Sequence, residues 1–261
     1  MLEDLDFADD VALVSSTRDQ LQRKTSDLSL AAKQLGLNIN RKKTKTMQLT
    51  DTPLPVELEN EGLEEVEEFT YLGSIMSKSN ATVKDITNRL QKAKSLFVQL
   101  NRVWRSSNIS EKNKIKIYNS NVLSVLLYGA ECWRVTQRDS QRLSGFHTSC
   151  LRKICRIYWP EKITNKELYQ RTGQRDITTV IKQRRWRWLG HVIRKDHDSI
   201  TRTALRWTPD SGRRKRGRPR ETWRRTIEAE MKTTGKTWRE LEKAAMEREQ
   251  WKSLVTALCA T

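Results

Sequence analysis

Asp9 and Asp10 are adjacent acids between two short apolar runs, in the stretch Leu-Asp-Phe-Ala-Asp-Asp-Val-Ala-Leu-Val that begins at Leu5. Two apolar strands on either side of a short polar turn predict a β-hairpin with both carboxylates at its tip. Like-charge repulsion makes such a pair costly, and a divalent cation with oxygen ligands, such as Mg²⁺, offsets that cost. The pair therefore indicates metal-assisted phosphoryl transfer. An acidic turn without chemistry is the alternative, because Asp is a common turn residue.

A single hairpin does not supply all the carboxylates that two-metal nucleotidyl transfer uses. Asp4 and Asp6 lie along the same expected strand, so they do not face Asp9 and Asp10 from a neighbouring strand. Only six residues precede Phe7. From the sequence we therefore expect no polymerase activity from this chain by itself.

The residues after the acidic turn predict elements that could support it. A helix signal begins at Thr17, where Thr-x-x-Gln is typical of a capping box, and ends at Gly36, which suits the position after a helix. Leucines and alanines recur at helical spacing in between and predict a helix over residues 17–35. The next stretch, residues 36–44, alternates enough to predict a strand that leads into a cationic segment containing Lys43.

Three segments, in this order, resemble motifs C, D and E of the reverse transcriptases of non-LTR (LINE-type) retrotransposons. They are Phe-Ala-Asp-Asp at residues 7–10, Gly-Leu-Asn-Ile-Asn at residues 36–40 with Lys-Thr at 43–44, and Phe-Thr-Tyr-Leu-Gly at residues 69–73. The resemblance covers roughly residues 2–76. In that family the reaction is RNA-templated DNA synthesis from deoxynucleoside triphosphates with Mg²⁺, and an endonuclease domain usually precedes the polymerase.

The resemblance also implies roles for individual residues. Asp9 and Asp10 would be catalytic carboxylates that bind the metal. Lys43 would be the catalytic lysine beside the triphosphate, whereas its local sequence by itself favours a solvated strand end. The primer grip, a hairpin that guides the primer terminus, would contain Phe69, Tyr71, Leu72 and Gly73.

The middle of the chain predicts helices. Apolar residues between Thr82 and Trp104 fall on one face at steps of three and four, as in an amphipathic helix. Its other face suits either a thumb helix beside a template–primer duplex or a plainly solvated surface. That face carries Lys84, Arg89, Lys92 and Lys94.

A second expected helix begins after Ser110 and ends near Gly129. A third expected helix begins after Thr136. The residues expected to face the core from it are Leu143, His147, Cys150, Leu151 and Ile154.

His147, Cys150 and Cys155 invite a zinc interpretation, because histidine and cysteine are the usual zinc ligands. Some LINE-type elements carry a knuckle of three cysteines and one histidine, but its regular spacing is absent here. At helical periodicity Cys150 shares a stripe with Leu143 and Ile154, and free cysteines are often buried. We therefore interpret the group as core.

The charge of the chain is large and uneven. The net charge is +18, and fifteen Lys and Arg stand against four acids between Arg184 and Arg225. Residues 51–68, in contrast, hold eight acids and no Lys or Arg. A concentrated basic region favours a polyanionic partner, and we expect RNA and DNA.

A helix is predicted over residues 177–195, with Ile181, Trp188 and Val192 as its apolar stripe. Arginine pairs bidentately with phosphate, and tryptophan stacks on unpaired bases. We predict that Trp188 lies in the core and that Trp186 is more exposed. The nucleic-acid-binding residues expected on this basis are Arg184, Arg185, Trp186, Arg187, Arg213, Arg214, Lys215, Arg216, Arg218 and Arg220.

Residues 213–220 read Arg-Arg-Lys-Arg-Gly-Arg-Pro-Arg, in which Gly and Pro oppose a regular helix. The Arg-Gly-Arg-Pro core resembles an AT-hook, whose arginines enter the narrow minor groove of A·T-rich DNA. A nuclear import signal and a solvated linker are the alternatives. Two helices are expected after this run, starting at Thr222 and Thr237 and packed as a small hairpin.

The predicted fold class is α+β: a truncated polymerase palm with a small antiparallel sheet and a helix, then a mostly α-helical thumb and C-terminal extension. The expected divisions are residues 1–76 (palm remnant), 77–135 (thumb-like), 136–200 (helical extension) and 201–261 (basic linker and terminal helices). Four cysteines without a signal peptide predict an intracellular protein, with the nucleus as one destination. No apolar run approaches the length of a membrane span.

The function predicted from the sequence is that of a fragment of an RNA-directed DNA polymerase, inactive by itself. A non-catalytic nucleic-acid-binding protein that acts through residues 177–225 is the alternative. A transcript that yields no functional protein is a third.

Overall fold

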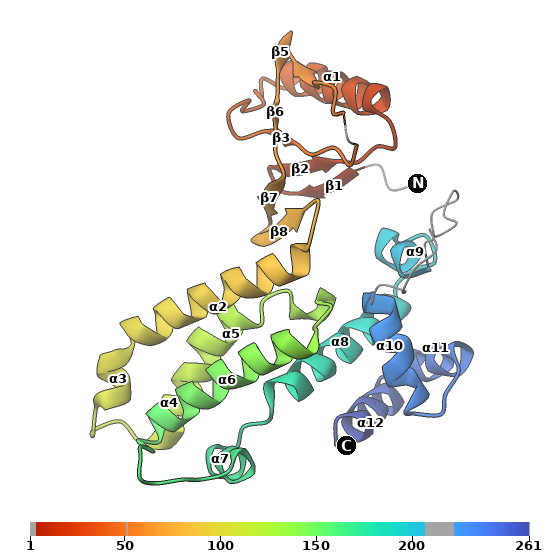
Figure 1. The fold of residues 1–261 in the computed structure, drawn as a ribbon. Helices are drawn as coiled ribbons and strands as arrows, with labels where there is room; N and C mark the ends of the chain where they lie inside the picture. Colours follow the sequence, from red (N-terminus) through yellow and green to blue (C-terminus); the bar gives the residue numbers. More distant parts are fainter. Residues whose placement is uncertain (1–3, 51, 207–221, 261) are drawn as a thin grey trace. The chain divides into compact units, whose positions relative to one another are not determined.

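The computed structural model describes residues 4–50, 52–206 and 222–260 (Figure 1). The described chain is α+β, mostly helical with small sheets, as the sequence predicts. It divides into two compact units, Met1–Lys84 (unit 1) and Asp85–Thr261 (unit 2).

Unit 1 holds the strands and one long helix. Each sheet that the structure describes has two strands, and three of the four are antiparallel. The hairpins are β1 (Asp4–Phe7) with β2 (Asp10–Leu13), β4 (Glu57–Leu58) with β5 (Glu61–Gly62), and β7 (Glu68–Tyr71) with β8 (Ser74–Ser77). The parallel pair is β3 (Lys45–Thr46) with β6 (Glu64–Glu65), and the helix is α1 (Arg18–Gln34).

Local signals set both ends of α1, as predicted. The hydroxyl of Thr17 accepts a hydrogen bond from the backbone N–H of Gln20 at its start. At its end Gly36 has φ +73°, and the N–H groups of Gly36 and Leu37 donate to the carbonyls of Lys33 and Ala32. This pair of bonds is a Schellman motif, which needs a left-handed residue and so favours glycine.

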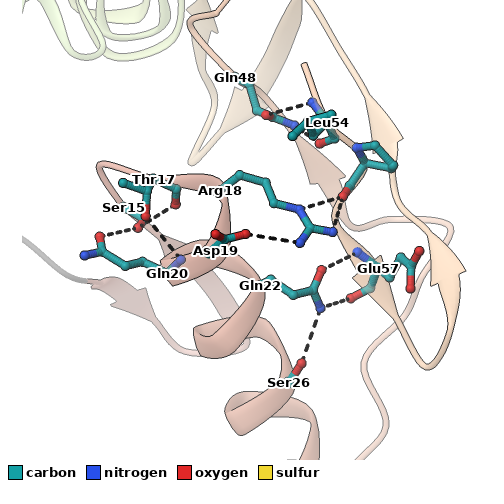
Figure 2. Close-up of polar contacts among 11 residues, drawn as sticks. Ser15, Thr17, Arg18, Asp19, Gln20, Gln22, Ser26, Gln48, Leu54 and Glu57 are labelled. Carbon is teal, nitrogen blue, oxygen red and sulfur yellow. Dashed lines mark hydrogen bonds and ion pairs between the residues drawn. The ribbon is translucent and has the colours of Figure 1, made fainter. Parts of the chain in front are cut away.

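Side chains of α1 hold Pro55 and the first residue of β4, Glu57 (Figure 2). The guanidinium of Arg18 donates twice to the carbonyl of Pro55, at 3.0 and 2.8 Å. The amide of Gln22 exchanges two hydrogen bonds of 2.8 Å with the backbone of Glu57 and so extends the strand edge. Below these bonds lies a core of Val56, Leu58 and Leu63, with Leu21 and Ile39 against it.

The strand predicted over residues 36–44 is wrong. Residues 41–43 form a turn, and regular pairing begins only at Lys45. The cause is Asn40: its side-chain oxygen accepts from the N–H of Lys43, and its backbone carbonyl accepts from Lys43 and Thr44. An asparagine that bonds the backbone ahead of it in this way replaces a ladder with a turn.

Unit 2 is built from helices, and α2 crosses its boundary. The helices are α2 (Ala81–Gln99), α3 (Asn101–Arg105), α4 (Glu111–Ile117), a π-helical stretch (Tyr118–Leu123), α5 (Ser124–Leu126), a 3₁₀ turn (Ala130–Cys132), α6 (Gln137–Ile154), α7 (Asn165–Thr172), α8 (Ile177–Ile193), α9 (Ile200–Arg206), α10 (Trp223–Lys232), α11 (Trp238–Met246) and α12 (Arg248–Leu258).

The predicted amphipathic helix over residues 82–104 is divided at Leu100 into α2 and α3. Its apolar face is buried as expected, and the indole N–H of Trp104 donates to the carbonyl of Phe97 at 2.7 Å. The polar face differs from the prediction at one position. Arg89 is buried, with its guanidinium 4.3 Å from the centre of the Tyr128 ring, because a cation over an aromatic face is stabilised without water.

Helix α8 links two hydrophobic cores. Its first turns, with Ile177 and Ile181, complete a core formed by α2 to α7, while Trp186, Leu189 and Ile193 enter a second core with α10, α11 and α12. The single apolar stripe predicted for this helix is therefore wrong. The last two helices, α11 and α12, pack on α8.

Gly190 allows the closest of these approaches. The indole of Trp251 lies where a side chain at residue 190 would be, since a Cβ there would be 2.2 Å from Nε1 of Trp251. That indole donates a hydrogen bond of 2.9 Å to the carbonyl of Trp186. In the described residues no helix is both long and apolar enough to cross a membrane.

Candidate functional site

The predicted acidic tip is present in unit 1. Phe7 pairs with Asp10, so Ala8 and Asp9 form a two-residue turn, and Ala8 has φ +55°. Positive φ suits the short turns that join right-twisted strands. Asp9 and Asp10 are both exposed at this tip. Their carboxylates are open to a cation from solvent.

The predicted primer grip is also a hairpin. Tyr71 pairs with Ser74 across a turn in which Leu72 has φ +47° and Gly73 has φ +79°. Positive φ at both central positions is the type I′ turn, which favours glycine at the second. Phe69 and Leu72 are exposed by 36% and 38%, so the hairpin presents apolar groups to solvent instead of burying them.

One contact brings the two hairpins together. The hydroxyl of Tyr71 donates a hydrogen bond of 3.2 Å to the backbone carbonyl of Asp10. The two residues are 61 positions apart in the chain, so this neighbourhood is a result of tertiary structure. The bond leaves the Asp10 carboxylate available while it fixes the backbone that carries it.

Lys43 lies in the turn before β3 and is exposed. Its backbone is held by Asn40, as described above. Among the described residues no hydrogen bond or ion pair joins its ammonium to Asp9 or Asp10. The role of Lys43 at a triphosphate remains a prediction.

The hard oxygen atoms of Asp9 and Asp10 are the ligand type that Mg²⁺ takes. Within the described residues no group of three or more His, Cys, Asp or Glu is placed to hold a metal ion. The tip thus offers two exposed carboxylates of this ligand type, and among the side chains that the structure describes no third carboxylate joins them.

His147, Cys150 and Cys155 are core residues, which agrees with the sequence interpretation. Both ring nitrogens of His147 have partners, the Tyr118 hydroxyl at 2.8 Å and the Arg175 carbonyl at 3.2 Å. Burial lowers the pKa of His147 to about 4 and raises the pKa of the Cys150 and Cys155 thiols to about 12. Neutral thiols and a fully bonded imidazole are poor zinc ligands.

The structure corrects the predicted nucleic-acid surface of α8. Trp186 is fully buried, and Trp188 is the more exposed of the two tryptophans, opposite to the prediction. Arg185 is also buried. Glu230 accepts from both side chains at 2.6 Å, so neither Arg185 nor Trp186 presents its polar group to a ligand. Sequence periodicity missed this because α10 covers a second face of α8.

Two of the remaining predicted contacts on α8 differ in availability. Arg184 donates to the carbonyl of Leu127 at 3.0 Å and lies 3.6 Å from the carboxylate of Glu131. Arg187 is exposed. The predicted contacts within the basic run, at residues 213–220, lie outside the described residues.

Arg187 belongs to a cationic groove between α8 and α12, of about 340 Å³. Its cations are Arg187 on α8, Arg194 at the C-terminal cap of α8, and Arg248 and Lys252 on α12, and Trp251 also lines it. Burial, and then the nearby charge of Arg248, lower the pKa of Arg194. None of the described residues that line the groove is an acid.

Sequence reasoning missed Arg248 and Lys252. Their spacing of four on a helix that also carries the apolar residues Trp251 and Val255 was the available signal. Nothing local to α12, however, indicates that α8 lies opposite. The packing of Trp251 on Gly190 sets that arrangement.

Two family models and one curated protein match this chain. Residues 5–76 match the family described as reverse transcriptase (RNA-dependent DNA polymerase), and residues 96–128 match a domain of unknown function (DUF6451). A protein of Caenorhabditis elegans described as transposon-derived is 26% identical over 267 residues, which cover 97% of this chain and 95% of that protein. No solved structure matches. Residues 5–76 are thus similar to a reverse transcriptase segment, and the chain as a whole is similar to a transposon-derived protein.

Proposed function

We propose that this chain is part of the RNA-directed DNA polymerase of a non-LTR retrotransposon. In this proposal unit 1 is the part of the palm that carries motifs C, D and E, and α2 begins the thumb. The observation that carries it is the hydrogen bond from Tyr71 to the carbonyl of Asp10. This bond joins the hairpin that carries Tyr71 to the tip that carries Asp9 and Asp10, and it supports the proposal because primer extension needs a primer grip next to the metal site.

Asp9 and Asp10 would hold Mg²⁺ from one side, with their exposed carboxylates as ligands. Mg²⁺, when bound, supplies activation of the primer 3′ hydroxyl and charge stabilisation of the leaving pyrophosphate. The described residues bring no third carboxylate to the tip, and two-metal sites need more than one hairpin. We therefore propose that the 261-residue chain does not extend a primer when assayed by itself.

The test is complementation. The full chain is mixed with a separate polypeptide that carries the fingers and motif A of a related reverse transcriptase, and extension of a labelled DNA primer on RNA is measured with Mg²⁺. We expect extension in the mixture, loss of at least about a hundredfold with Asp9→Asn or Asp10→Asn, and no change with Asp27→Asn. Asp27 is a matched control because it is an exposed acid of the same unit, on α1.

A second readout does not depend on activity. Mn²⁺ bound to the full chain is measured by its effect on water proton relaxation, and Asp10→Asn is compared with Asp27→Asn. We expect weaker Mn²⁺ binding only in the Asp10 variant. Equal binding by both variants, together with extension that survives Asp9→Asn, would contradict a metal role for the tip.

The cationic groove between α8 and α12 favours a second candidate, a non-catalytic nucleic-acid-binding protein. Four Lys and Arg side chains line it, and none of its described lining residues is an acid. Phosphate oxygens are the complementary ligand, because arginine forks bind them bidentately.

Salt-dependent affinity distinguishes this candidate. We expect Arg187→Gln, Arg248→Gln and Lys252→Gln together to lower duplex DNA affinity at least tenfold and to reduce the log–log salt slope by about 2 to 3. The matched control removes three exposed charges elsewhere in unit 2, Lys112→Gln, Lys116→Gln and Lys166→Gln. Equal losses in both triple variants would show general attraction to a basic protein. Neutralising residues 213–220 in a fluorescent fusion tests nuclear import separately.

A further inference from the structure

Tyr158, which lines a second basic groove, and the next residue, Trp159, are exposed aromatic residues. Their exposed fractions are 60% and 84%. The groove, of about 330 Å³, is lined by Trp104, Arg105, Lys153, Arg156 and Tyr158. An exposed indole leaves a large apolar surface in water, and a cluster of such surface next to cations is characteristic of a binding site.

The end of α6 fixes this group in place. Ile157 is buried, and its N–H donates to the carbonyl of Arg152 at 3.0 Å, while the N–H of Arg156 donates to Lys153. This is again a Schellman motif, but the residue at its left-handed position is Arg156, with φ +57°. Glycine would take this conformation without steric cost, so an arginine here is held against its local preference.

The cations are held as well. The guanidinium of Arg156 donates to the backbone carbonyl of Arg105 at 2.6 Å, which ties the end of α6 to the end of α3. The ammonium of Lys153 lies 5.7 Å from the centre of the Phe97 ring. Among the described residues that line the groove there is no acid. Three positive charges are therefore gathered where no carboxylate of the lining neutralises them.

We propose that this groove binds single-stranded nucleic acid, with bases stacked on Tyr158 and on the adjacent Trp159 and phosphates on Arg105, Lys153 and Arg156. Flat aromatic rings next to cations match an unpaired strand, because every unpaired base offers a π-face within reach of a phosphate. A duplex does not offer such a face, since its bases are stacked inside. This proposal rests on the proposed function and specifies single strands within its nucleic-acid partners. The site shares no lining residue with the groove between α8 and α12.

The test is fluorescence anisotropy of labelled 12-nucleotide single-stranded RNA and DNA, and of a duplex, with the full chain over a range of salt concentrations. We expect Trp159→Ala to weaken single-strand binding about fivefold or more, with the salt slope unchanged and duplex binding within twofold. Arg105→Gln with Arg156→Gln should instead lower the single-strand salt slope by about 1.4, since each phosphate contact contributes about 0.7. The control for charge is Lys112→Gln with Lys116→Gln, two exposed positions of α4.

Two further variants separate stacking from general apolar contact. Trp159→Phe keeps a ring and should stay within about twofold of the unmodified chain, whereas Trp159→Leu keeps apolar area without a ring and should bind as weakly as Trp159→Ala. Single-strand affinity that is unchanged in Trp159→Ala, or equal in the Leu and Phe variants, would overturn the proposal. Binding of polyglutamate with the same dependence on Trp159 would overturn it too. Metal binding at Asp9 and Asp10 is measured separately, so failure here leaves the polymerase proposal standing.

Discussion

The two units of this protein differ in how much of their apolar surface they bury. Unit 1 has a core of Val56, Leu58 and Leu63, and leaves Phe7, Leu49 and other large apolar side chains exposed. Unit 2 buries two extended clusters. Two-stranded hairpins are marginal without a hydrophobic face to pack on, while helices gain most of their stability from packing. The candidate site at Asp9 and Asp10 thus lies in unit 1, which has the smaller core, whereas most of the buried apolar surface that stabilises the protein lies in unit 2.

Among the variants that test this difference, Trp186→Ala should have the largest effect on stability. Trp186 is fully buried, its ring centre lies 5.8 Å from that of Trp251 in a tilted arrangement, and its indole donates to Glu230. We expect the free energy of unfolding of unit 2 to fall by about 3–5 kcal/mol, the usual cost of removing a buried aromatic ring. Urea denaturation measures it, and hydrogen exchange should show faster opening in unit 2 with little change in unit 1. Trp159→Ala, at an exposed position, is the control and should change stability by less than about 0.5 kcal/mol. Equal effects would contradict the assignment of Trp186 to the core.

The next test is the pH dependence of unit 2. The pKa of His147 is lowered from 6.5 to about 4 by burial, so the unfolded chain binds a proton on this group at higher pH than the folded chain does. Stability is therefore complete above pH 6.5 and is lost as pH falls toward 4, by about 3 kcal/mol. Denaturation between pH 7 and 5 should show this slope in the unmodified chain and in His191→Gln, but not in His147→Gln. A slope that persists in His147→Gln would assign it to another group.

Replacing two glycines of unit 2 by alanine should change the stability of the protein in opposite directions. Gly145 in α6 has nothing within 4 Å of an added Cβ, so Gly145→Ala should stabilise the protein by about 0.5–1 kcal/mol. In Gly190→Ala the added Cβ would meet the Trp251 indole, and we expect a loss of about 1–3 kcal/mol despite the better helix propensity. Thermal melting of both variants measures the difference. Stabilisation by both would mean that α12 does not pack closely on α8.

The smallest effect concerns unit 1. Tyr71→Phe removes the hydrogen bond to the Asp10 carbonyl and should lower the local opening free energy of the β1–β2 hairpin by about 0.5–1 kcal/mol. Hydrogen exchange of the amides of residues 10–13 measures this. The amides of α6 should be unaffected. If the hairpin amides exchange at the same rate in both proteins, the contact does not hold the tip.

Local signals were enough to predict much of the framework. Thr136 with Asp139 and Thr237 with Glu240 are capping boxes in the structure, and Gly36 has the left-handed conformation expected after α1. The same signal, Thr164 with Glu167, starts α7, which the sequence analysis overlooked. These features involve bonds between residues three or four apart, so the sequence alone contains them.

The burial of particular faces was not predictable in this way. Asn40 turned an expected strand into a turn through one side-chain bond, and Leu100 divided an expected helix. Arg89 and Trp186 were expected on the surface and are buried, because Tyr128 and Glu230 reach them from other parts of the chain. Periodicity identifies an apolar stripe but not how many neighbours a helix has.

The sequence by itself determined the acidic tip, the glycine turns and most helix starts, since each depends on the conformational preferences of adjacent residues. Only the tertiary structure decided that Tyr71 adjoins Asp10, that α12 faces α8, and that Arg105 and Arg156 line one groove with Tyr158. These arrangements depend on contacts between residues dozens of positions apart. No local preference specifies such contacts, because they form only when separate elements bury their apolar faces together.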